Sequence, residues 1–192
     1  YNSESLTCND RPILPIMGEF HFSRYPEGEW KTALKKMQQG GVDIVAAYVF
    51  WIHHEEAEGE WDFSGRRNLK AFLSCCQEAG MKVWLRIGPW AHGECRNGGF
   101  PDWLVEKEKR GNLSLRTDDP QYLKYVDLFF TKIAEQADGY MHKDDGPVIG
   151  IQIENEYGHA GGPSDREEGM AHMRTLRAMA EEKGLTAPYY SA

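Results

Sequence analysis

The chain has 192 residues, of which 41% are hydrophobic, 12% aromatic and 27% charged, a composition that is typical of folded domains and excludes a disordered tail. Its 30 acidic and 22 basic residues give a net charge of -8, so we expect no nucleic acid partner. No apolar run approaches the ~20 residues that cross a bilayer, so we expect no membrane span, and the first ten residues lack a signal-peptide pattern.

Two kinds of segment alternate along the first third of the chain. Residues 13–20 are mainly apolar and predict a strand that is buried on both faces. Residues 30–37 carry apolar side chains at helical spacing, and Gly40 supplies a stop. Residues 42–51 are β-branched and aromatic, which predicts a second buried strand, and a polar loop is expected over residues 53–64.

The same order repeats in the middle of the chain. A helical stripe over residues 69–76 precedes a third strand over residues 81–87. A long loop rich in Gly, Trp and charged residues follows, and we predict a short helix within it over residues 101–109. A long amphipathic helix is predicted over residues 119–137, because Asp before Pro is a favourable helix start.

The last quarter adds one more unit of this kind. Residues 147–153 predict the fourth strand. Ser164 and Glu167 form a capping-box pattern that opens a helix, and Gly184 ends it. Residues 188–191 predict the beginning of a fifth strand.

Repeated strand-helix units require a parallel sheet with right-handed crossovers, hence a doubly wound sheet or a (β/α)8 barrel. No glycine-rich phosphate loop follows the first strand, and polar residues gather at the carboxyl ends of the strands, where barrel enzymes place their active sites. We therefore predict an α/β fold that is a partial (β/α)8 barrel, with four units and the start of the fifth strand. Since a complete barrel needs ~250 residues, we expect residues 1–192 to be a fragment of one domain whose strand edges and apolar interior are exposed.

The segment QIENEYG places Glu154, Asn155 and Glu156 at the end of a buried strand. A carboxylate at such a position needs a partner or a functional role, because removing a charge from water is costly. Strand alternation puts Glu154 and Glu156 on one face, unless the strand ends near Ile153. The structural alternative is that Glu154 forms an ion pair inside the barrel and Glu156 caps the next loop.

The loop after the third strand supplies a second group of candidates. Trp90 offers a flat apolar face and Glu94 offers a hydrogen-bond acceptor, a combination that suits a sugar ring with its hydroxyl groups. Tyr48 and Trp51 lie at the end of the second strand, where they either contact a sugar or pack in the core. The alternative for Trp90 and Trp103 is packing beneath the loop.

Four segments in this order, GEFHFSRYP, AYVFW, RIGPW with GGFPDWL, and QIENEYG, resemble glycoside hydrolase family 35, the β-galactosidase family of retaining exo-glycosidases. The resemblance runs from about residue 13 to residue 158. It implies that Glu156 is the general acid/base, that Asn155 binds the 2-hydroxyl of a terminal β-D-galactosyl residue, and that Tyr48 and Glu94 bind other hydroxyls. It implies a carbohydrate substrate and no cofactor.

In that family the nucleophile lies on the seventh barrel strand, which this chain does not reach. We therefore expect the 192 residues alone to be inactive, with the rest of the barrel and C-terminal β domains supplied by further sequence. The family resemblance implies a periplasmic, secreted or lysosomal location.

Two other functions are compatible with the same residues. A metal-dependent hydrolase would use rim histidines and Glu94, although no spacing such as H-E-x-x-H is present. Its candidate histidines are His21, His53, His54 and His92. A carbohydrate-binding barrel would keep the aromatic residues of the rim without catalysis.

Overall fold

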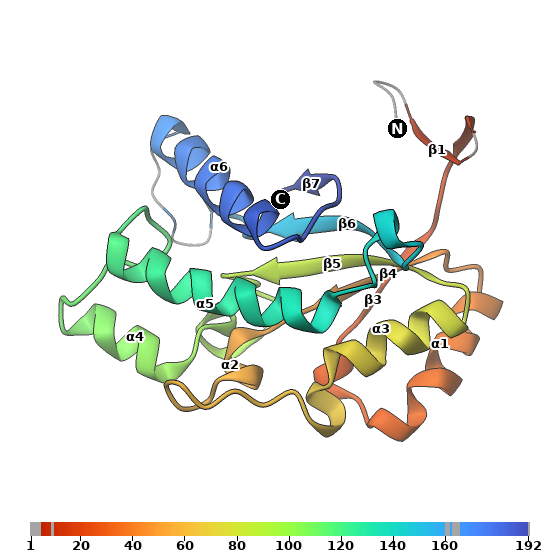
Figure 1. The fold of residues 1–192 in the computed structure, drawn as a ribbon, viewed down its shortest axis with the longest axis horizontal. Coiled ribbons are helices and arrows are strands. Elements are labelled where there is room, and N and C mark those ends of the chain that lie inside the picture. The colour runs from red at the N-terminus through yellow and green to blue at the C-terminus, as the bar shows by residue number, and fades with distance from the viewer. Residues whose placement is uncertain (1–4, 9, 160–161, 163–165, 192) are drawn as a thin grey trace.

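The computed structural model of the chain describes residues 5–8, 10–159, 162 and 166–191. Its main sheet has five strands, which are β3 (Met17–Phe20), β4 (Ile44–Tyr48), β5 (Lys82–Gly88), β6 (Val148–Ile153) and β7 (Tyr189–Tyr190). All neighbouring pairs are parallel, and the spatial order is the chain order (Figure 1). A doubly wound sheet reverses its strand order at a switch point, whereas a barrel keeps it sequential. The predicted α/β fold of a partial barrel is confirmed.

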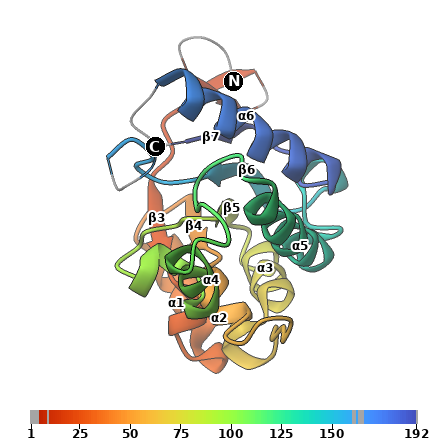
Figure 2. The same ribbon diagram turned by 90° about the vertical axis from the view of Figure 1, so that its left-hand side faces the viewer.

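Helices cover one side of this sheet. They are α1 (Trp30–Gln39), α2 (Trp51–His54), α3 (Leu69–Glu78), α4 (Asp102–Lys109), α5 (Pro120–Ala137) and α6 (Arg166–Glu182). Helix α1 contacts α3, α3 contacts α5, and α5 contacts α6, so these four helices follow one another in an arc around the strands (Figure 2). Such an arc is the outer layer of a barrel.

Short 3-10 turns and a hairpin complete the fold. The turns are η1 (Phe22–Arg24), η2 (Glu27–Glu29), η3 (Gly65–Arg67), η4 (Arg96–Gly99) and η5 (His142–Asp144). Strands β1 (Leu6–Cys8) and β2 (Arg11–Ile13) pair antiparallel and precede the sheet. Helix α2 begins at Trp51, so the predicted polar loop over residues 53–64 starts with the end of a short helix.

The predicted helix starts and stops agree with the structure where it describes them. The Asp119 carboxylate accepts hydrogen bonds from the backbone N–H groups of Gln121 and Tyr122, which satisfies two of the free donors at the start of α5. Gly184 follows α6 with a φ of +90°, a conformation that glycine adopts without strain. The predicted capping box lies partly outside the described residues, because Ser164 is not among them.

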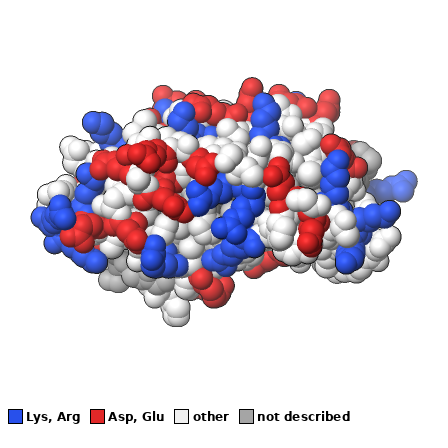
Figure 3. All heavy atoms as spheres, turned by 90° about the horizontal axis from the view of Figure 1, so that it is seen from below, with Lys and Arg blue, Asp and Glu red and all other residues white. Residues whose placement is uncertain are grey.

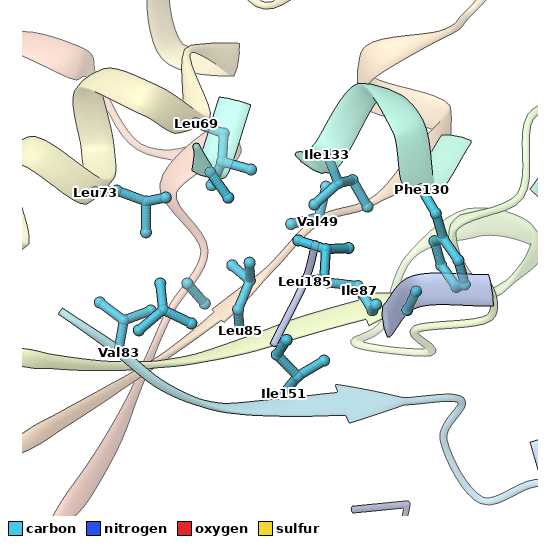
Figure 4. Packing of buried hydrophobic residues seen from close by; sticks show 14 of the residues in the cluster. Val49, Leu69, Leu73, Val83, Leu85, Ile87, Phe130, Ile133, Ile151 and Leu185 are labelled. Carbon is cyan, nitrogen blue, oxygen red and sulfur yellow. The ribbon is translucent and has the colours of Figure 1, made fainter. Parts of the chain in front are cut away.

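The hydrophobic core lies between the sheet and the helices. Val83, Leu85 and Ile87 of β5 point toward the helices, and Leu73 of α3 and Ile133 of α5 meet them (Figure 4). All five side chains are fully buried. Because side chains alternate along a strand, the residues between them face the other side of the sheet, which would be the barrel interior.

The expectation for the first strand is wrong. Residues 13–20 were predicted as one strand that is buried on both faces, whereas β3 covers only Met17–Phe20 and just Phe20 is buried. Leu14 is 96% exposed and Ile16 is 57% exposed. The physical reason is position: β3 is an edge strand of the described sheet, so one side of it has no neighbouring strand.

Charged residues of both signs are interspersed on the face seen from below, with Lys and Arg near the middle and at both ends and with Asp and Glu between them (Figure 3). This face therefore offers no continuous positive surface. None of the helices in the described ranges combines the length and the apolar composition that a bilayer crossing requires.

Candidate functional site

The two carboxylates that follow β6 occupy opposite environments. The strand ends at Ile153, and both Glu154 and Glu156 have a positive φ, of +57° and +47°. The alternation of a strand therefore stops before either residue. The side chain of Glu154 is completely buried, whereas that of Glu156 is 49% exposed.

Glu154 is held by Arg116, from the loop between α4 and α5. Arg116 Nε lies 3.1 Å and 3.0 Å from the two carboxylate oxygens, and both side chains are almost fully buried. Burial raises the pKa of Glu154 to about 7, and the hydrogen bonds and charge of Arg116 oppose that shift. The ion pair of Glu154, which the sequence leaves open as one alternative, is therefore present, and its partner is Arg116, a residue that no sequence pattern indicates.

Asn155 is fixed through its side-chain oxygen. Arg86 Nη2 donates to this oxygen at 2.8 Å and Gln152 Nε2 donates to it at 2.9 Å. Two donors on the oxygen leave the side-chain N–H groups of Asn155 available for an acceptor such as a sugar hydroxyl.

Tyr48 belongs to the same cluster on the inner face of the sheet. Its hydroxyl donates to Glu19 Oε1 at 2.6 Å, and Arg86 Nη1 donates to the same oxygen at 2.6 Å. The Arg86 guanidinium also contacts the Tyr48 hydroxyl and lies 4.1 Å from the ring centroid. Burial and the hydrogen bond to Glu19 raise the pKa of Tyr48, so the phenol stays neutral and keeps its proton.

Glu94 lies in the loop that follows β5, where its φ is +49°. Its backbone carbonyl accepts a hydrogen bond from Arg24 Nη2 at 3.3 Å. A cavity of about 550 Å3 adjoins this loop, and its lining is Arg24, Ile52, His53, Glu56, Glu94, Cys95, Arg96 and Asp102. The loop also reaches the end of β6, because His92 Nδ1 lies 3.4 Å from Glu156 Oε2.

Trp90 has several partners within the chain. The Arg116 guanidinium lies 4.6 Å from its ring centroid, and Phe100 meets it edge-on at 5.6 Å. A Cβ on Gly98 would lie 2.3 Å from the indole, so only glycine fits there. The indole N–H is buried without a hydrogen-bond partner among the described residues. Trp90 therefore packs against residues of this chain, and its predicted contact with a sugar stays a prediction.

The structure disperses the histidines of the metal hypothesis. His54 is buried and stacks on Phe63 at 4.6 Å, and His53 Nδ1 pairs with the hydroxyl of Ser23 at 2.8 Å. Across the described part of the chain, no three His, Cys, Asp or Glu side chains lie close enough together to hold a metal ion.

The structure therefore brings Tyr48, Asn155 and Glu156 to one end of the sheet, with Glu94 and Trp90 on the adjoining loop. Arg86 joins Tyr48 and Asn155. Arg116 supports the segment that carries Asn155 and Glu156. Neither arginine was among the predicted site residues. Arg86 had a detectable signal, since it is a charged residue inside a strand of apolar residues. Arg116 had none, because it lies in a loop of polar residues.

The family description "Glycosyl hydrolases family 35" matches residues 5–189. A beta-galactosidase of Homo sapiens is 37% identical over 158 residues, which are 82% of this chain and 23% of that protein. A beta-galactosidase of Xanthomonas manihotis is 35% identical over 174 residues, which are 91% of this chain and 28% of that protein. The chain thus spans about a quarter of the length of these relatives.

Solved structures share the fold at lower identity. An exo-beta-1,4-mannosidase from Opitutaceae bacterium strain TAV5 matches with a TM-score of 0.70 and 20% identity, over 94% of this chain and 32% of that one. A beta-galactosidase from the psychrophilic Marinomonas ef1 matches with a TM-score of 0.56 and 20% identity, over 76% of this chain and 22% of that one.

Proposed function

Because the chain belongs to glycosyl hydrolases family 35, we propose that it is the N-terminal part of the catalytic barrel of a retaining β-galactosidase, a glycosidase that removes terminal β-D-galactosyl residues. The observation that carries this proposal is the contrast at the end of β6. Glu154 is buried in an ion pair, whereas Glu156 lies half-exposed beside Asn155. Of the two carboxylates, Glu156 is the one that a substrate can reach.

Glu156 acts as the general acid and base. In the first step its carboxyl proton passes to the glycosidic oxygen while the bond from that oxygen to the anomeric carbon breaks and a second carboxylate bonds to the carbon. In the second step Glu156 takes a proton from water, and the water oxygen displaces the carboxylate from the anomeric carbon. That nucleophile, ~5–5.5 Å from Glu156 in a retaining enzyme, comes from sequence that follows this chain.

The other residues bind the galactosyl unit. Asn155 presents its side-chain N–H groups to the 2-hydroxyl, because its oxygen is already occupied by Arg86 and Gln152. The neutral Tyr48 and the carboxylate of Glu94 bind further hydroxyls, and Trp90 borders the sugar. The 192 residues alone are expected to be inactive, since they lack the nucleophile.

The test uses the complete gene product, meaning the protein encoded by the whole reading frame that contains these 192 residues. Glu156→Gln should lower kcat/KM for phenyl β-galactoside by about 10²–10⁴-fold, the usual contribution of general acid catalysis. Glu106→Gln, on the exposed side of α4, is the matched control and should leave activity unchanged. Hydrolysis by Glu156→Gln at the wild-type rate contradicts the proposal, and galactose binding without any turnover favours the carbohydrate-binding alternative.

A further inference from the structure

Arg116 contacts the segment around Glu156 through its side chain. Its Nε and Nη2 atoms hold the Glu154 carboxylate, and Nη2 also donates to the backbone carbonyl of Asn155 at 3.1 Å. Arg116 is only 3% exposed. Water therefore does not compete for these hydrogen bonds, which makes them stronger than the same contacts on the surface.

A second set of contacts joins Arg116 to the residue after Glu156. The Tyr157 hydroxyl donates to the Arg116 backbone carbonyl at 2.7 Å, and the guanidinium lies 5.2 Å from the Tyr157 ring centroid. The residues on both sides of Glu156 thus bind to one arginine. The described contact of the Glu156 side chain itself is with His92, at 3.4 Å.

The backbone of this segment needs such support. Glu154 and Glu156 both have φ values in the left-handed region, a backbone conformation that residues other than glycine rarely adopt. Conformations of this kind persist only where surrounding contacts determine them. With these backbone conformations the Glu154 carboxylate is fully buried and the Glu156 carboxylate is half-exposed.

We propose that Arg116 is a positioning residue for the acid/base Glu156, because it fixes Glu154, Asn155 and Tyr157 and thereby the direction of the carboxyl group between them. This inference rests on the proposed function. It requires arginine, since only a planar guanidinium reaches the Glu154 carboxylate and the Asn155 carbonyl together while stacking on aromatic rings.

The test measures kcat/KM of the complete gene product for two aryl β-galactosides. The phenol leaving group of the first compound needs a proton on its oxygen. The 2,4-dinitrophenol leaving group of the second departs as a stable anion and needs no proton. Arg116→Lys and Arg116→Ala should lower kcat/KM by more than about tenfold for the phenyl compound but by less than about threefold for the dinitrophenyl compound, because they impair proton donation. A loss of folded protein lowers both values equally, so their ratio is insensitive to stability.

Three further arms make the outcome decisive. Arg110→Ala removes an exposed arginine with its own glutamate partner, Glu106, and should leave the ratio unchanged. Guanidinium ion added to Arg116→Ala should restore activity toward the phenyl compound. If both Arg116 variants lower kcat/KM for the two substrates by the same factor, Arg116 is only structural and the inference fails. If Glu156→Gln also leaves the ratio unchanged, the proposed function itself fails.

Discussion

The two faces of the sheet differ in what covers them and in what they carry. The face toward the helices is apolar and closed, since Val45, Val83 and Leu85 are fully buried beneath α3 and α5. The opposite face carries Tyr48 and Arg86, and its polar groups bind one another. Strand alternation produces both faces from the same short segments.

This difference separates stability from chemistry. The described residues of the outer face are buried against helices of this chain, so we expect them to determine folding. The inner face has polar side chains whose hydrogen bonds orient a few atoms, so we expect its residues to determine activity. Exposed apolar side chains before β3, such as Leu14, belong to neither face.

The largest effect is expected on the outer face. Leu85→Ala should lower the free energy of unfolding by about 2–5 kcal/mol, because it removes buried methyl groups and leaves a cavity among residues that cannot fully relax. Urea denaturation of the complete gene product measures the change. A loss below about 1 kcal/mol would show that the helix layer is loosely packed and that the outer face does not determine stability.

A pH effect is expected from His54, which is fully buried at the end of α2 between Phe22 and Phe63. Burial lowers its pKa from 6.5 to about 4, so the unfolded chain takes up a proton below pH 6.5 that the folded chain refuses until about pH 4. Stability from this group is therefore full above pH 6.5 and is lost as the pH falls toward 4. At pH 5 the loss should be about 2 kcal/mol.

His54→Phe isolates that contribution, because other groups titrate in the same range. Burial raises the pKa of Glu154 to about 7, and this gives the opposite slope between pH 4.5 and 7. The stability difference between wild type and His54→Phe should change by about 2 kcal/mol between pH 7 and pH 5. If the difference in the free energy of unfolding between the two proteins does not change with pH, His54 is not held neutral by burial.

The inner face should respond in activity. Arg86→Lys keeps the charge but cannot hold Asn155 and the Glu19–Tyr48 pair together, so kcat/KM for β-galactosides should fall about 10–100-fold, as for loss of a charged hydrogen bond worth about 1.5–3 kcal/mol. Arg110→Lys, at an exposed ion pair with Glu106, is the control and should change little. If the two variants have the same kcat/KM, the inner face does not determine activity.

The smallest effect is expected before β3. Leu14→Ala makes the same chemical change as Leu85→Ala at a side chain that is 96% exposed. The free energy of unfolding should change by less than about 0.5 kcal/mol, as for most surface substitutions. A larger loss in the complete gene product would show that further sequence covers Leu14.

Much of the fold could be predicted from residue spacing. The strands over β4, β5 and β6 and the helix α5 follow from apolar periodicity and from Asp119 before Pro120, which are local properties of the chain. The first strand was mispredicted because an apolar run indicates that a segment can be buried, whereas burial itself depends on neighbours. In the described structure β3 has a neighbouring strand on one side only.

The candidate site divides in the same way. Short motifs pointed to Tyr48, Asn155 and Glu156, because these residues stand at the ends of strands that the sequence reveals. The contrast between Glu154 and Glu156 was left open, since strand alternation does not extend beyond Ile153. Arg116 was not found at all.

By itself the sequence determined the repeated strand-helix units, the family and the segments that carry the chemistry, because each depends on residues that are close together in the chain. The tertiary structure alone decided which carboxylate is buried and which is accessible. That choice depends on a contact between Arg116 and Glu154, 38 positions apart. Local spacing holds no information about such a contact, since it forms only when the loop after α4 folds against the end of β6.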